Sequence, residues 1–157
     1  MTGRGVSPPV AVALATVAFF ALAIAGLGMA SLLLEADVIA TPGVGQLAGV
    51  AAVALSTAAF GGLLWAYLRQ PQPSYVAALP VTVAAVLAYL LGIGVGAMLQ
   101  GADAALALAA AGGFATSWFA LVLAGAAFVA SWSAVALVRT RAERPRWPWE
   151  RDDPDEP

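Results

Sequence analysis

The amino-acid sequence predicts an all-α integral membrane protein, a four-helix bundle with both termini in the cytoplasm. Two features of composition lead to this fold class: 62% of the 157 residues are hydrophobic and 10% are charged. Soluble domains have roughly 45–50% apolar and about 25% charged residues, and a short chain cannot bury so much apolar surface in a soluble core. The charges are also unevenly placed, because five precede residue 139 and eleven follow from there onward.

Four apolar segments are long enough to cross a bilayer, since a spanning helix needs roughly 20 apolar residues. Ser7 and Pro8 suit the cap and first turn of the first helix, and Thr41 and Pro42 repeat that pattern before the second. The second helix therefore begins at residue 42 or at Gln46. The predicted spans are residues 8–34, 42–68, 75–99 and 114–138.

The start of the fourth span is less plain, because residues 104–138 carry no charge. One continuous helix over this stretch would be about 52 Å long, against a hydrocarbon core of about 30 Å. Gly112-Gly113 is the expected break. We therefore predict a short interfacial helix over residues 104–111, capped by Asp103, before the span; the alternative is one long, tilted helix.

The first apolar segment also has features of a secretory signal peptide. Arg4 gives a weak positive start, and Ala23-Ile24-Ala25 resembles a cleavage site. The apolar sequence nevertheless continues to Leu34 without a polar stretch. We interpret the segment as a retained span.

The charges of the loops predict the orientation. With four spans, Arg4, Arg69 and every arginine from Arg139 onward fall on one side of the membrane. The opposite loops contain carboxylates and no basic residue. The positive-inside rule places both termini in the cytoplasm, and the protein in the bacterial cytoplasmic membrane. The carboxylates of the opposite loops are Glu35, Asp37 and Asp103.

Two prolines shape the connection between the second and third spans. Residues 69–74 form a short, stiff loop that contains Pro71 and Pro73, so these two spans should be antiparallel neighbours. Pro80 lies just inside the third span, where it should free the carbonyl of Val76 and kink the helix.

A shift of 66 residues aligns parts of the two halves of the chain. The first and third spans match at several positions, whereas the second and fourth match poorly. Two similar helical hairpins in tandem would explain the matches, and chance similarity between Ala-rich helices is the alternative. The matched segments are Thr16-Val17-Ala18 with Thr82-Val83-Ala84, and Ala36-Asp37 with Ala102-Asp103.

Small residues recur every four positions along the third span, at Ala84, Ala88, Gly92 and Gly96. Such a stripe lets two helix backbones approach closely, and this packing drives helix association in lipid. The stripe predicts either packing inside one bundle, which we favour, or the seam of a homo-oligomer. Similar stripes are Ala54, Ala58, Gly62 and Ala66 in the second span, and Ala126, Ala130 and Ala134 in the fourth.

The composition removes most reactive chemistry. The chain has no Cys and no His, and all seven basic residues are Arg. Thiolate catalysis, histidine acid–base catalysis, Schiff bases and Cys or His metal ligation are therefore excluded. We predict no catalytic, cofactor-binding or metal-binding residues. The three loop carboxylates could bind a cation, but we interpret them as helix caps and solvated loop residues.

The C-terminal tail, residues 139–157, changes from basic to acidic along its length. Its basic part should be attracted to anionic lipid headgroups, and the acidic, proline-containing end should be disordered. A docking motif for a cytoplasmic partner is the alternative, and nothing indicates nucleic-acid binding. The residues predicted to contact lipid or a partner are Arg139, Arg141, Arg144, Arg146, Trp147 and Trp149.

The tail motif Arg146-Trp147-Pro148-Trp149-Glu150-Arg151-Asp152, together with four short Ala-rich and Lys-free spans, resembles uncharacterised small membrane proteins of actinobacteria. That resemblance implies a fold and no activity. Small multidrug-resistance exporters are similar in span number, but they need a carboxylate within the first span. Here the first carboxylate is Glu35, at the end of that span, so proton-coupled export is not expected.

Two functional hypotheses follow. The preferred one is a non-enzymatic structural or accessory subunit, which uses its small-residue faces for packing and its tail for lipid or a membrane-protein partner. The alternative is a small transporter or channel, oligomeric or not, with a hydrated route. No ionisable side chain lies between the span ends, so such a route would use hydroxyl groups. The best-placed hydroxyl residues are Thr16, Ser56, Thr57 and Thr82.

Overall fold

The computed structural model describes residues 6–70 and 73–139. Within these ranges all regular structure is helical, and there are no strands. The elements are α1 (Pro8–Leu34), α2 (Gln46–Leu68), a 3-10 helix η1 (Tyr75–Ala77) that leads into α3 (Ala78–Leu99), α4 (Ala104–Ala115) and α5 (Trp118–Arg139).

The predicted fold class is confirmed, because four of these helical segments are long and apolar enough to span a membrane. α1 contributes 27 residues, α2 23, η1 with α3 25, and α5 22. At about 1.5 Å per residue, each exceeds the hydrocarbon thickness of roughly 30 Å. α4, with 12 residues, is too short to span.

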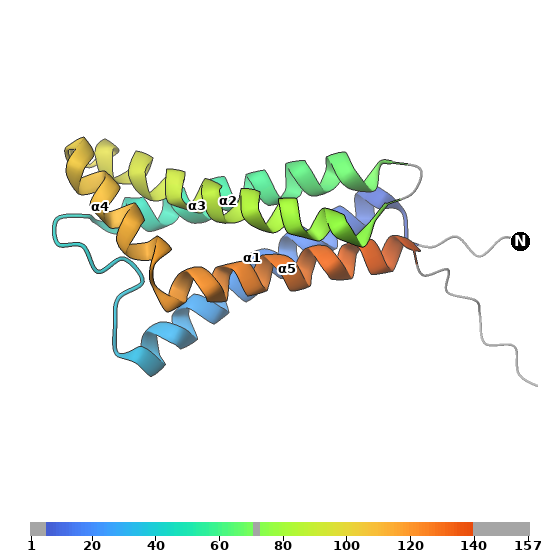
Figure 1. Cartoon of the computed structure of the whole chain (residues 1–157), viewed down its shortest axis with the longest axis horizontal. Helices are drawn as coiled ribbons and strands as arrows, with labels where there is room; N and C mark the ends of the chain where they lie inside the picture. Colours follow the sequence, from blue (N-terminus) through green and yellow to red (C-terminus); the bar gives the residue numbers. More distant parts are fainter. Residues whose placement is uncertain (1–5, 71–72, 140–157) are drawn as a thin grey trace, which may run out of the picture.

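The four long helices form two antiparallel pairs, α2 with α3 and α1 with α5 (Figure 1). Both ends of the described chain lie at the same end of the bundle, which we call the terminal end. The opposite end, which we call the loop end, contains residues 35–45 and α4. α1 diverges from α2 toward the loop end, where residues 35–45 bridge the two helices.

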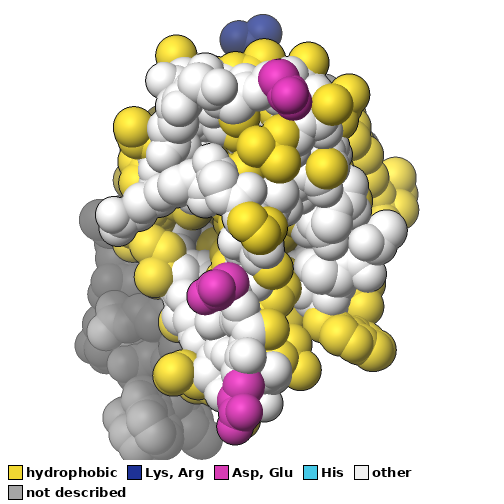
Figure 2. Space-filling model, turned by 90° about the vertical axis from the view of Figure 1, so that its left-hand side faces the viewer, with side chains coloured by type: hydrophobic (Ala, Val, Ile, Leu, Met, Phe, Trp, Pro, Cys, Tyr) yellow, Lys and Arg dark blue, Asp and Glu magenta, His cyan; other side chains and the backbone are white. Residues whose placement is uncertain are grey.

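Charge is divided between the two ends of the described chain. The carboxylates of Glu35, Asp37 and Asp103 belong to the loop end, which Figure 2 shows facing the viewer. The described arginines, Arg69 and Arg139, follow α2 and end α5 at the terminal end. This is the distribution on which the sequence-based orientation depends.

The start of α2 corrects one predicted boundary. The helix begins at Gln46 after the N-cap residue Gly45, and not at residue 42. The carbonyl of Thr41 accepts a hydrogen bond from Val44 N at 3.2 Å, so this segment is a turn. At α1, Ser7 has the extended backbone of an N-cap residue, but its hydroxyl makes no capping hydrogen bond.

A second correction concerns the break before α5. Residues 104–139 form two helices rather than one long helix, but α4 continues through Gly112-Gly113 to Ala115. The hydroxyl of Thr116 donates to Gly112 O at 3.1 Å, and that of Ser117 donates to Phe114 O at 2.7 Å. These side chains satisfy the last carbonyls of α4 and end the helix there.

The N-terminus of α4 has the predicted cap. Asp103 has an extended backbone, and its carboxylate accepts a hydrogen bond from Leu106 N at 2.7 Å. Phe114, in the last turn of α4, is buried against Tyr89 of α3 with ring centroids 4.5 Å apart. α4 is therefore fixed at its first turn by a cap and at its last turn by an aromatic contact.

Pro80 does not leave an unpaired carbonyl. It is the third residue of α3, directly after η1, and the carbonyl of Val76 accepts from Ala78 N. The missing N–H of Pro80 falls in the first helical turn, where proline is tolerated. The change from 3-10 to α-helical geometry occurs where the sequence predicted a kink.

The two halves of the chain are not built alike. The second half contains the additional helix α4 between its two long helices, whereas residues 35–45 of the first half form a loop. The predicted tandem hairpins also differ in partners, since α1 packs mainly on α5 and α2 mainly on α3.

Candidate binding groove between α1 and α2

The predicted packing stripe of α3 lies largely against α2. Ala88, Gly92 and Gly96 are buried, whereas Ala84 is half-buried. A Cβ atom on Gly92 would lie 2.7 Å from Ala51 O, and one on Gly96 would lie 2.8 Å from Leu47 O. The glycines therefore allow backbone contact inside one chain.

Of the two other small-residue stripes, one is buried and the other is exposed. Ala126, Ala130 and Ala134 of α5 are buried, on the helix that packs against α1. On α2 the stripe is exposed, and Gly62 has no neighbour within 4 Å of a Cβ atom built on it. The buried face of α2 is a different one, formed by Ala48, Ala52, Ser56, Phe60, Leu64 and Leu68.

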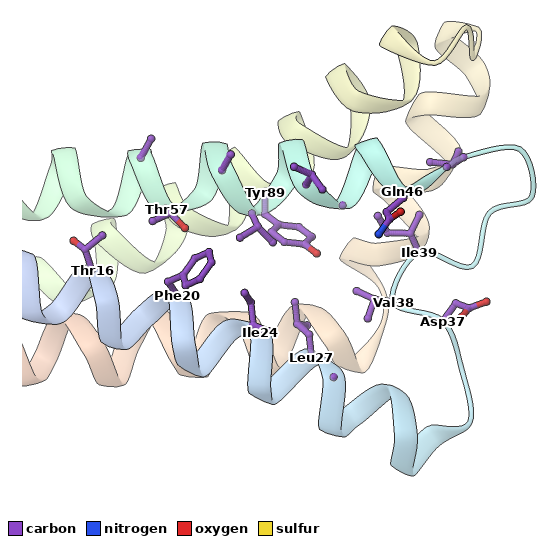
Figure 3. A pocket seen from close by; sticks show the side chains of 18 of the residues that line it. Thr16, Phe20, Ile24, Leu27, Asp37, Val38, Ile39, Gln46, Thr57 and Tyr89 are labelled. Carbon is purple, nitrogen blue, oxygen red and sulfur yellow. The ribbon is translucent and has the colours of Figure 1, made fainter.

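A groove of about 1220 Å³ separates α1 from α2. Its walls come from α1, residues 37–45 and α2, and Tyr89 of α3 forms part of its floor (Figure 3). Large apolar side chains line the α1 side, including Phe20, Ile24 and Leu27. The α2 side has many small residues, which leave the space open: Gly45, Gly49, Ala54, Ala58 and Gly61.

Several apolar side chains of the groove are covered only in part by the protein. Phe20 is 44% exposed, Ile24 50% and Val50 59%. They lie on α1 and α2, two of the helices that are long and apolar enough to span a membrane. The apolar surface of the groove therefore suits a lipid-like occupant better than water.

Tyr89 brings a hydroxyl group to this apolar groove. Its ring is 2% exposed and stacks on Phe114. Its hydroxyl makes no hydrogen bond to another described residue, and Figure 3 shows it directed into the groove between the α1 and α2 side chains. Tyr89 is not among the hydroxyls selected from the sequence; its signal there is its position as the tyrosine farthest from the ends of the predicted spans.

Thr16 and Thr57 line the same groove, and their hydroxyl oxygens are buried without a hydrogen-bond partner in the described chain. Thr16 Oγ1 lies against Gly61, where a Cβ atom would be 3.1 Å away. The structure thus brings together two of the four hydroxyls selected from the sequence.

The two other selected hydroxyls do not face the groove. Ser56 is buried and donates to Ala85 O of α3 at 2.8 Å. Thr82 donates to Ala78 O of its own helix at 2.8 Å. Both are satisfied by backbone carbonyls and serve helix structure and packing.

A buried core packs α1 against α2 beside the groove. Phe19 of α1 and Phe60 of α2 are buried and stacked, with ring centroids 4.5 Å apart and an interplanar angle of 15°. Leu64 and Leu68 continue the buried core toward the terminal end. The lining residues Thr16 and Gly61 mark how far the groove reaches in that direction.

The loop end of the groove has a polar rim. Asp37 and Gln46 line it and are exposed, whereas Val38 and Ile39 are half-buried. Asp37 is the one charged residue among those that line the groove. Within residues 6–70 and 73–139, no three potential metal-binding side chains gather into a site.

The basic tail was predicted to contact lipid or a partner, and its first residue is described. Arg139 is exposed, and its guanidinium carbon lies 5.0 Å from the ring centroid of Tyr75. The Tyr75 ring also packs on Trp132 at 4.8 Å. The other tail residues of that prediction lie outside the described residues: Arg141, Arg144, Arg146, Trp147 and Trp149.

Comparisons with known proteins place the chain in a family without adding a function. No curated protein and no solved structure matches it. Residues 6–157 match a family defined by sequence, so the match covers the helical bundle and the tail. The chain belongs to the Family of unknown function (DUF6121).

Proposed function

We propose that this protein is a non-enzymatic, multi-pass accessory protein of the bacterial cytoplasmic membrane, and that it binds a lipid-like molecule in the groove between α1 and α2. The observation that carries the proposal is the groove itself, an apolar space of about 1220 Å³ within the spanning part of the bundle. Ligand sites of drug-like size are about 300–1,000 Å³ and mostly apolar, so the space is ample for such a molecule.

The proposed orientation sets both termini in the cytoplasm. The terminal end contains Arg69 and Arg139, and the loop end contains the three described carboxylates. By the positive-inside rule the loop end faces outward. The groove then opens toward the outer leaflet, and the basic part of the tail lies at the anionic headgroups of the inner leaflet.

A small transporter or channel is the second candidate, and the unpartnered hydroxyls of Thr16 and Thr57 favour it. A conducting route through the bundle would also have to pass the buried core toward the terminal end, which contains Leu64 and Leu68. We therefore favour a binding role, in which the ligand enters and leaves from one side. A protein partner or a second copy of the chain could bind this protein at the groove once the groove holds its ligand, in keeping with an accessory role.

Filling the groove tests the proposal. Ala58→Trp places a large side chain on the groove wall, whereas Ala66→Trp places the same side chain on the exposed α2 face two turns farther along, outside the groove. Native mass spectrometry of protein purified from bacterial membranes should show a lipid-like adduct on the wild type and on A66W. The adduct on A58W should be at least about fivefold less abundant.

Two results would contradict the proposed function. One is a wild-type protein that retains no lipid-like molecule at any detergent concentration that preserves its helical circular dichroism. The other is an adduct of equal abundance on A58W, A66W and the wild type, which would indicate non-specific annular lipid.

A further inference from the structure

The hydroxyls of the groove lie near the middle of the membrane-spanning region. Tyr89 is about 15 Å from the loop end of α3, and Thr57 is about 16 Å from the loop end of α2, at 1.5 Å per residue. The hydrocarbon core is about 30 Å thick. These groups are therefore far from the headgroups and from bulk water.

Hydroxyls elsewhere in the spans are satisfied by backbone carbonyls. Ser131 donates to Ala127 O at 2.8 Å, and Ser133 donates to Val129 O at 2.7 Å. Ser56 and Thr82 likewise have carbonyl partners. Among the described hydroxyls more than one turn from a helix end, three have no hydrogen-bond partner, and all three belong to residues that line the groove: Thr16, Thr57 and Tyr89. The Thr16 and Thr57 oxygens are buried, whereas the Tyr89 hydroxyl is directed into the groove.

An unsatisfied hydroxyl in an apolar environment is costly, at roughly 1–3 kcal/mol in proteins. Lipid tails have no group that could pair with it. The Tyr89 hydroxyl can reach a molecule in the groove, because the residue is 2% exposed and its hydroxyl is directed into the groove (Figure 3). A bound molecule there could supply the missing hydrogen bond, whereas the Thr16 and Thr57 oxygens are buried by the protein itself.

The charge of the lining restricts what that molecule can be. Asp37, at the exposed rim, is the sole charged lining residue, and the deep part is lined by neutral hydroxyls and apolar side chains. A charged group at this depth would meet no counter-charge and would be strongly disfavoured. The group that reaches Tyr89 is therefore neutral.

Building on the function proposed above, we infer that the ligand is a neutral, lipid-soluble molecule with an oxygen-bearing group on an apolar skeleton, such as a quinone or a long-chain alcohol. The oxygen-bearing group lies deep in the groove beside Tyr89, and the skeleton lies along Ile24 and Val53. A phospholipid held by its headgroup at the membrane surface would leave the Tyr89 hydroxyl unpaired.

Two matched probes test this ligand class. 2-Decyl-1,4-benzoquinone and decylbenzene have the same chain and ring size and differ in the two carbonyl oxygens. Their apparent Kd values for the full-length protein are measured by calorimetric titration in one detergent. The wild type should bind the quinone at least about tenfold more tightly, since each hydrogen bond gained is worth several-fold in affinity.

Substitutions then locate the recognition. Tyr89→Phe should weaken quinone binding about three- to tenfold and leave decylbenzene binding unchanged. The control variants Tyr67→Phe and Thr82→Val remove hydroxyls that do not line the groove, and they should bind both probes as the wild type does. Helical circular dichroism checks that each variant folds.

The outcomes separate this inference from the proposed function. Equal affinity of the wild type for the two probes, or quinone binding that is unaffected by Tyr89→Phe, overturns the ligand class. The groove function survives that result if Ala58→Trp still removes the bound lipid-like molecule. If the wild type binds neither probe, the inference fails, and the adduct measurement alone decides the proposed function.

Discussion

Two glycines of α3, which have no side chain, determine how closely α2 and α3 approach each other. At Gly92 and Gly96 the backbone of α3 lies against backbone atoms of α2, so a Cβ atom would overlap groups that no rotamer change can move. Close backbone contact increases the dispersion attraction on which helix association in lipid depends. The packing role of these residues could be predicted from the sequence, because residues spaced four apart lie on one face of a helix.

We predict that Gly92→Ala destabilises the protein by about 1–3 kcal/mol, the usual cost of overpacking. The matched control is Gly94→Ala on the same helix, because a Cβ atom there has no neighbour within 4 Å. G94A should be neutral, or stabilised by the higher helix propensity of alanine. Unfolding of the purified protein in mixed detergent micelles, followed by circular dichroism, measures both; equal stability of G92A and G94A would contradict the packing.

At the scale of elements, the bundle consists of two tightly packed helix pairs that separate toward one end. α2 and α3 are joined by the glycine contacts, by a hydrogen bond from Ser56 Oγ to Ala85 O, and at their caps by one from Gln100 Nε2 to Gly45 O. α1 and α5 also approach closely, since a Cβ atom on Gly26 would lie 2.8 Å from Val122 Cγ1. The groove lies between these pairs, so its width depends on the angle between them.

Ser56→Ala should therefore cost about 0.5–1.5 kcal/mol, because it removes a bond between two helices and leaves the same shape. Ser131→Ala is the matched control: Ser131 is equally buried, but it bonds to Ala127 O of its own helix. That substitution should cost less than about 0.5 kcal/mol, since the acceptor already belongs to a helical turn. Thermal unfolding in detergent compares the two, and a larger loss for S131A would refute the assignment.

The sequence predicted the number of spans and most of their boundaries, because length and apolar content suffice for that. It misplaced the break before α5, since Gly112 and Gly113 remain helical and the hydroxyls of Thr116 and Ser117 end α4 instead. The groove was not predictable at all. Thr16 and Thr57 belong to different helices, and no spacing in the chain indicates that α1 and α2 diverge.

At the scale of the whole molecule, the distribution of charge agrees with the arrangement of the helices. The described arginines and carboxylates occupy opposite ends of a bundle whose long helices match the thickness of a bilayer. Such a molecule can be oriented by charge alone. Orientation in turn decides which leaflet would face the polar rim of the groove, which contains Asp37 and Gln46.

The absence of cysteine from the chain permits a direct measurement of orientation. Single cysteines are introduced as Ala40→Cys in the loop between α1 and α2 and as Gln70→Cys after α2; both positions are exposed and lie at opposite ends of the bundle. In intact bacterial cells a membrane-impermeant maleimide should label A40C and not Q70C, because the arginine-bearing end stays in the cytoplasm. Permeabilised cells, in which both variants should react, provide the control. Labelling of Q70C alone in intact cells would invert the topology, and the groove would then open toward the inner leaflet.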